Sequence, residues 1–183
     1  MEFPQFLDND TTSVTWNRTV RRLEFIGTVS TVDVATFGSA NPNSPSGVSL
    51  KINQEEFNVA SQGQPCRNNT LNFLAFDKNS TAPYAGIPFS FFDPRTCGRA
   101  PQLINSFTVA EMELATNGLA QWIANVSPSD SVLIFSIGDA AYASWSPGLK
   151  LQLEQVGVST FQLDILQAGE PFVLFGKKGT VGG

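Results

Sequence analysis

Runs of apolar residues in the second half of the chain alternate with polar turns and predict strands and helices in turn. Thr70–Phe76 and Ser131–Ile137 are apolar at most positions, which is typical of strands buried on both faces. Phe172–Phe175 predicts a last core strand. Between these runs, apolar residues of 111–125 recur every three or four positions and predict a helix, and 149–155 predicts a second, shorter one.

The first half of the chain is more polar, and its apolar residues alternate rather than cluster. Strand character runs through Leu23–Phe37, and the alternation over Val48–Ile52 predicts a following strand that pairs with it. Pro101–Phe107 predicts another short strand. We interpret Val158–Ile165 as a short extended segment.

Together these elements predict an α+β or α/β fold, with a mainly antiparallel β core in two sheets and at least two helices packed against it. A chain of 183 residues suits one hydrophobic core. We expect that core to contain Leu119, Trp122, Leu133, Phe135, Phe172 and Leu174. We divide the chain into an N-terminal extension with an added strand, residues 1–47, and a main domain, residues 48–183.

The charge and composition of the chain exclude several classes of partner and chemistry. The net charge is −5, and the basic residues are scattered apart from Arg18, Arg21 and Arg22, which argues against nucleic-acid binding. No apolar run reaches the roughly 20 residues of a membrane span, so we predict no membrane insertion. The chain has no histidine, which excludes Ser-His-Asp and Cys-His catalysis. We predict no metal site and no cofactor.

Two cysteines, Cys66 and Cys97, lie in loops rich in Pro, Asn and Gly. We predict that they form a disulfide in an oxidising compartment, with two buried free thiols as the alternative. The disulfide would stabilise the fold by roughly 3–4 kcal/mol. Mass spectrometry without reductant decides between the two. The N-terminus has no signal-peptide pattern, so we expect an excised domain of an extracytoplasmic protein, secreted or on the cell surface.

The acidic turn after the strand Ser131–Ile137 is the first candidate binding site. Tyr142 and Trp145 follow Asp139 closely and would form a shallow aromatic platform beside a carboxylate, which suits a sugar ring. The alternatives are core packing for the two rings and a turn-capping role for the carboxylate. Gly176–Gly179, with two lysines between glycines, is either an anion-binding loop or a strand exit, and we favour the strand exit.

A phenylalanine-rich loop is the second candidate site. Phe89, Phe91 and Phe92 lie in a segment bounded by prolines, and an extended chain directs them to both sides. A short loop buries all three with difficulty, so the functional hypothesis is a surface for a partner protein. The alternative is a loop folded back over the core.

The order of these segments is similar to that of a known family. It resembles the interleukin-like EMT-inducer domain, also called the GG domain, over roughly residues 48–181. The resemblance rests on Asn69–Asp77, Asn105–Thr108, Leu119–Ile123, Val132–Ile137, Gly138–Ala141 and Phe172–Gly179. It implies a compact, non-enzymatic module. Members include secreted cytokine-like proteins, a carbohydrate-recognising stem domain of a glycosyltransferase, and domains of Bacteroidetes surface proteins, among them sortase-like cysteine peptidases of the type IX secretion system.

We therefore expect a non-catalytic recognition or interaction module of an exported or cell-surface protein. One hypothesis is carbohydrate binding, with a glycan held by Asp139, Tyr142 and Trp145. The other is a protein-interaction or spacer domain that contacts a neighbouring domain of its parent protein, for example a sortase-like peptidase. A secreted cytokine-like protein is a further alternative.

Overall fold

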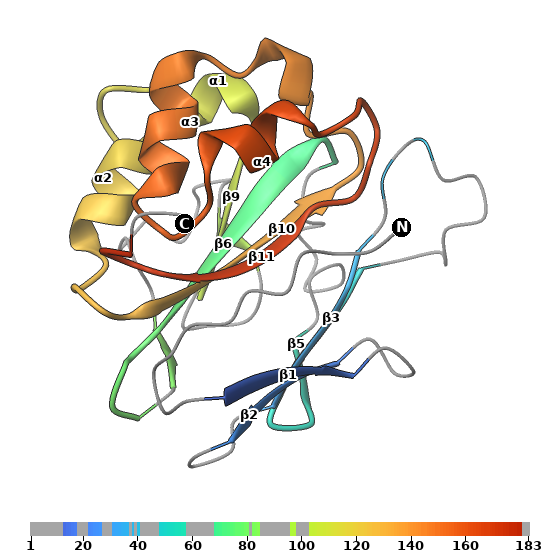
Figure 1. Cartoon of the computed structure of the whole chain (residues 1–183), viewed down its shortest axis with the longest axis vertical. Coiled ribbons are helices and arrows are strands. Elements are labelled where there is room, and N and C mark those ends of the chain that lie inside the picture. Colours follow the sequence, from blue (N-terminus) through green and yellow to red (C-terminus); the bar gives the residue numbers. More distant parts are fainter. Residues whose placement is uncertain are drawn as a thin grey trace.

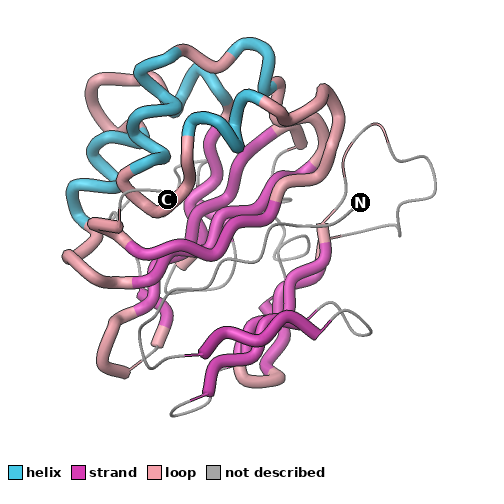
Figure 2. Tube along the Cα trace, in the orientation of Figure 1, coloured by secondary structure: helices cyan, strands magenta, loops and turns pink. Residues whose placement is uncertain are grey.

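The computed structural model describes residues 13–17, 22–26, 31–36, 38, 40, 48–57, 68–80, 82–84, 96–97 and 103–180. These residues form two antiparallel sheets and four α-helices, arranged in three layers (Figure 1). The helices cover one face of the larger sheet, and the smaller sheet packs on its other face (Figure 2). The predicted α+β fold with a two-sheet antiparallel core is confirmed. Within the described ranges, no helix is long and apolar enough to cross a membrane.

The smaller sheet is a meander in which strands adjacent in sequence pair with each other. Its order is β1-β2-β3-β4-β5, formed by Ser13–Asn17, Arg22–Ile26, Thr31–Ala35, Ser49–Ile52 and Glu55–Phe57. The segment predicted as one strand, Leu23–Phe37, contains two strands, β2 and β3, which pair with each other. The predicted pairing with the second alternating segment is confirmed, because Val34 of β3 lies opposite Leu50 of β4. The predicted boundary at residue 47 falls between these two strands, so the N-terminal extension and the start of the main domain share one sheet.

The larger sheet has the order β11-β10-β6-β9-β8, and β7 pairs with part of β6. Its strands are β6 Thr70–Phe76, β7 Pro83–Tyr84, β8 Thr96–Cys97, β9 Ile104–Phe107, β10 Ser131–Ile137 and β11 Val173–Lys177. The strands predicted from apolar runs, β6 and β10, are its two central strands. They pair with each other over all seven of their residues.

The helical layer consists of short helices: α1 Val109–Met112, α2 Leu119–Asn125, α3 Pro147–Glu154 and α4 Thr160–Asp164, with a 3-10 turn η1 at Tyr142–Ser144. The prediction of a helix over 111–125 is confirmed for its second half, which is α2, but wrong in treating the segment as one continuous helix. Asn117 has a left-handed φ of 56°, and a Cβ on Gly118 would lie 2.0 Å from the carbonyl oxygen of Leu114. The chain therefore turns here and starts a new helix. The shorter helix predicted over 149–155 is confirmed as α3, and Gly157, with a φ of 96°, follows it.

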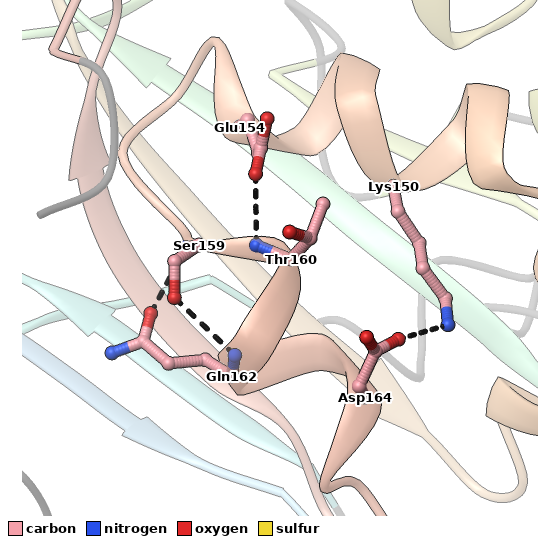
Figure 3. A network of polar contacts seen from close by, with 6 residues as sticks. All are labelled: Lys150, Glu154, Ser159, Thr160, Gln162 and Asp164. Atoms are coloured by element: carbon pink, nitrogen blue, oxygen red, sulfur yellow. Dashed lines mark hydrogen bonds and ion pairs between the residues drawn. The ribbon is translucent and has the colours of Figure 1, made fainter.

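The extended segment predicted over Val158–Ile165 was also wrong, because its centre is helix α4. A capping box starts this helix: the Ser159 hydroxyl accepts from the Gln162 amide at 3.3 Å, and the Gln162 side chain accepts from the Ser159 amide at 3.0 Å (Figure 3). The Ser-x-x-Gln spacing is the sequence signal for this cap. The apolar residues around it conceal the signal, because they alternate as they do in a strand.

The larger sheet separates two hydrophobic cores, where we predicted one. Leu119, Trp122, Phe172 and Leu174 belong to the core under the helices, whereas Leu133 and Phe135 belong to the core between the sheets. The physical reason is the alternation of side chains along a strand. Along β10, Val132 and Ile134 face the helices, and their neighbours face the smaller sheet.

Candidate functional site

The predicted aromatic site is a real cluster in the connection between β10 and α3. The rings of Tyr142 and Trp145 meet edge to face, with centroids 5.1 Å apart and an interplanar angle of 73°. Phe172, just before β11, contributes a third ring whose centroid lies 6.4 Å from each of the others. The three rings form one aromatic group within the core under the helices, which we call the helix-side core.

This group does not form an exposed platform. Tyr142 is 3% exposed and Trp145 is 5% exposed. The Trp145 indole donates to the Ala140 carbonyl at 2.9 Å, and the Tyr142 hydroxyl donates to the Glu170 carbonyl at 2.7 Å. The rings are therefore core residues whose polar atoms bond to backbone, and the prediction of a stacking surface for a sugar is corrected. Burial raises the pKa of Tyr142 to about 12.

Asp139 has the turn-capping role given as its alternative. One carboxylate oxygen accepts from the Ala141 amide at 2.8 Å, and the Asp139 amide donates to the Asn69 side chain at 3.0 Å. Ala141 adopts a left-handed φ of 50°, which this cap helps to hold. The described residues contain no group of three or more His, Cys, Asp or Glu placed to hold a metal ion.

The second predicted site and one cysteine lie outside the described residues. These are Phe89, Phe91 and Phe92, the proposed partner surface, and Cys66. Cys97 is in β8. The disulfide and the phenylalanine surface stay predictions.

One of the two lysines between the glycines at the end of β11, Lys178, stabilises a helix end, which the sequence did not indicate. The Lys178 ammonium donates to the carbonyls of Ile123 at 2.6 Å, Ala124 at 3.3 Å and Val126. These carbonyls end α2, which has no basic residue in its own last turn. A cation at this end of a helix stabilises it. Gly179, with a φ of 89°, supports the strand-exit interpretation.

A buried carboxylate joins two turns at the same end of the larger sheet. Asp130 is 2% exposed and accepts from the Tyr84 hydroxyl at 2.6 Å and from the Lys78 amide at 3.1 Å. The bonds tie the turn after β6 to the turn before β10. Burial, and then the bond to Asp130, raise the pKa of Tyr84 to about 12. Such contacts between distant segments leave no local signal in the sequence.

The exposed candidate site is on helix α4. Phe161 is 73% exposed and Ile165 is 60% exposed, whereas Leu163 between them is buried. Residues four positions apart lie on the same face of a helical turn, so these two side chains form what we call the α4 apolar pair. Leu151 of the neighbouring helix α3 is 57% exposed. Sequence reasoning missed the pair, because it assigned the segment to an extended chain.

Polar contacts fix α4 against α3 (Figure 3). The Lys150 ammonium pairs with the Asp164 carboxylate at 2.5 Å, and the Glu154 carboxylate accepts from the Thr160 amide at 2.9 Å. Both contacts run from one face of α3 to α4. Since Leu163 is packed beneath the helix, these bonds hold α4 from the side and present the α4 apolar pair to solvent in a fixed orientation.

The helical layer is also acidic. Residues 109–170 contain seven acidic residues and one basic residue, Lys150, against sixteen and eleven in the whole chain. The remainder of the chain therefore has nine acidic and ten basic residues and is close to neutral. Of the seven, Asp130 is buried, and the others are at least partly exposed. Glu111, Glu113, Asp139, Glu154, Asp164 and Glu170 thus give this layer a negative surface.

Comparison of the chain with models of known protein families gives no match, and neither does comparison with curated protein sequences. The resemblance to the interleukin-like EMT-inducer domain stays a prediction.

Proposed function

We propose that this chain is a non-catalytic interaction module of an exported protein, and that it binds a protein partner through helix α4. The observation that carries the proposal is the exposure of the α4 apolar pair, Phe161 at 73% and Ile165 at 60%. Large apolar side chains are common in the centres of protein interfaces, where their burial supplies most of the binding energy.

The fixed position of the pair supports this use. A partner that binds a rigid surface orders fewer side chains on association and loses less entropy. Helix α4 meets this requirement, because the capping box at Ser159, the Lys150–Asp164 ion pair and the buried Leu163 each restrain it. The carbohydrate hypothesis has less support, because Trp145 is buried and has no exposed ring face for stacking.

Selection of a random peptide library on the purified chain tests the proposal. Each selected peptide is measured against wild type, a Phe161→Ser/Ile165→Ser variant and a Leu114→Ser control, since Leu114 is 47% exposed and lies between α1 and α2. We expect the double variant to weaken binding at least about tenfold, or about 1.4 kcal/mol, and the control to have no effect. Peptides that bind all three proteins equally contradict a role for α4.

The non-catalytic part of the proposal has its own support and test. The chain has no histidine, and the Asp139 carboxylate is engaged in a turn. We expect no hydrolysis of peptide or glycoside substrates by the purified chain. Turnover that Asp139→Asn abolishes would contradict this part of the proposal. The predicted loop disulfide and the family resemblance support export of the parent protein.

A further inference from the structure

We infer that the partner of α4 is a basic amphipathic protein segment, one that combines apolar side chains with lysine or arginine. This inference rests on the proposed function and adds the chemistry of the partner. It follows from the place of the α4 apolar pair within the acidic segment 109–170.

The pair lies in a segment, residues 109–170, whose charged residues are acidic apart from Lys150. The excess of six acidic residues over 109–170 exceeds the net charge of the whole chain, −5, so the net negative charge of the protein belongs to this segment. Asp164 is on α4 itself and is largely exposed. Its ion pair with Lys150 uses the single basic residue of 109–170. Interfaces bring surfaces of opposite potential together, which speeds association and rejects partners of the wrong charge.

The same charge argues against other occupants of the face. A second copy of the chain would bring two acidic layers together, and like charges across an interface are unfavourable. Nucleic acids and anionic lipid surfaces recruit proteins through lysine and arginine, and 109–170 offers Lys150 alone. A neutral apolar segment would bury the pair but would gain nothing from the carboxylates of 109–170. A cationic amphipathic segment uses both features of the face.

The test uses the peptides selected by the random library. We expect those that depend on Phe161 and Ile165 to be enriched in lysine and arginine together with apolar residues. Raising the salt concentration from about 0.05 M to about 0.5 M should weaken their binding about tenfold or more, because salt screens exposed charges.

A matched pair of charge variants localises the effect. Asp164→Asn removes a carboxylate next to the α4 apolar pair, and Glu56→Gln removes an exposed carboxylate from β5 in the other sheet. Asp164→Asn should weaken the basic peptides about two- to fivefold, as expected for one exposed charge, and Glu56→Gln should leave their affinity unchanged. Neither side chain belongs to a core, so both variants should fold. Lys150→Gln breaks the same ion pair but keeps the carboxylate, so unchanged or tighter binding by this variant shows that Asp164→Asn acts through its charge and not through the restraint on α4.

Four outcomes separate the inference from the proposed function. Basic, salt-sensitive peptides that need both α4 and Asp164 support both. Peptides that need α4 but are neutral or acidic, or whose binding ignores salt and Asp164→Asn, overturn the inference and leave the proposed function standing. Concentration-dependent self-association that Phe161→Ser abolishes also overturns the inference. Absence of any α4-dependent peptide overturns both.

Discussion

The two faces of the larger sheet are both buried, yet they are covered in different ways. On one face, strands β3 to β5 contribute alternate apolar residues such as Val32 and Leu50, and the core between the sheets is filled by strand side chains. On the other face, four short helices and an aromatic turn cover β6 and β10. The acidic residues of 109–170 and the α4 apolar pair belong to this second side.

The difference shows two ways of covering a sheet. A meander positions its apolar residues through backbone pairing along the whole strand. Helices of four to eight residues are too short to be stable alone, so each depends on its cap and its packing. Helix α1 has a capping box at Thr108, and α3 has a Ser146 cap with Pro147 in its first turn. The C-terminal end of α2 is capped by Lys178 from a distant part of the chain. The helical side therefore depends on single contacts that substitutions can remove one at a time.

The largest expected effect tests whether the two cores unfold together. Phe73 of β6 packs under the helices against Phe107 and Trp122, and Phe135 of β10 faces the smaller sheet. Both side chains are fully buried, so Phe73→Ala and Phe135→Ala should each lower the free energy of unfolding by about 3–5 kcal/mol. Urea denaturation followed by tryptophan fluorescence and by circular dichroism measures the loss.

One cooperative unit requires the two signals to coincide in both variants. Separate transitions in Phe135→Ala would show that the smaller sheet unfolds independently. If either Ala variant does not fold, the Leu variants provide the same comparison with a smaller loss.

The next effect is a loss of stability in alkali. The chain has two tyrosines, Tyr84 and Tyr142, and the pKa of each is raised to about 12 in the folded protein. In the unfolded chain both ionise near 10. Because the folded state holds these protons longer, stability is unaffected below pH about 10 and falls as the pH rises from about 10 through 12.

Ultraviolet titration of tyrosinate measures the two pKa values. The native protein should show little tyrosinate at pH about 10, and the protein in urea should be half ionised there. The variants Tyr84→Phe and Tyr142→Phe each remove one ionisation step and so show which step belongs to Tyr84, at the end of the larger sheet, and which to Tyr142, in the helix-side core. Half ionisation of the native protein near pH 10 would contradict the buried environments.

Removal of the lysine cap should have a moderate effect that is confined to the helical side. Lys178→Met keeps much of the aliphatic chain but leaves the last carbonyls of α2 without their ammonium donor. We expect a loss of about 1–2 kcal/mol. Thermal unfolding measures it, with Lys51→Met as a control on the exposed face of β4, where a change below about 0.5 kcal/mol is expected. Equal losses in the two variants would mean that the cap contributes nothing specific.

The smallest expected effect on stability is at the proposed interface. Phe161→Ser and Ile165→Ser should each change the free energy of unfolding by less than about 0.5 kcal/mol, because both side chains are exposed. Leu163→Ala, in the same helix but buried, should cost about 2–5 kcal/mol. A large loss on Phe161→Ser would show that this ring packs on the fold and is not a free surface.

The sequence predicted the central strands to the residue and the helical layer less well, for physical reasons. Continuous apolar runs identify β6 and β10, because few other elements of that length are buried on both sides. A strand that is apolar on both faces borders two cores, one on each face, although we predicted a single core. Helix α4 was missed because a five-residue helix is too short to show its period, and its apolar neighbours Val158, Phe161, Leu163 and Ile165 imitate a strand.

The candidate site was less predictable than the fold. The sequence predicted that Tyr142 and Trp145 lie close together. It did not indicate that both rings are buried, which depends in part on contact with Phe172 from a distant segment. The bonds from Lys178 to α2 and from Tyr84 to Asp130 join residues more than 40 positions apart. The exposure of Phe161 depends on the helical conformation of a segment that its pattern concealed.

One buried amide has a consequence for how the chain assembles. Because β6 and β10 are apolar on both faces, burial alone penalises a sliding error between them only weakly. Asn72, fully buried in β6, donates to the Phe135 carbonyl of β10 at 3.3 Å, while its own oxygen has no partner among the described residues. Slippage by one residue would turn this amide into the helix-side core, and slippage by two would remove the Phe135 carbonyl and leave only the Thr70 hydroxyl, at 3.4 Å, as an acceptor. The lost hydrogen bond of a buried amide thus adds a cost to misaligned pairing that apolar burial does not supply.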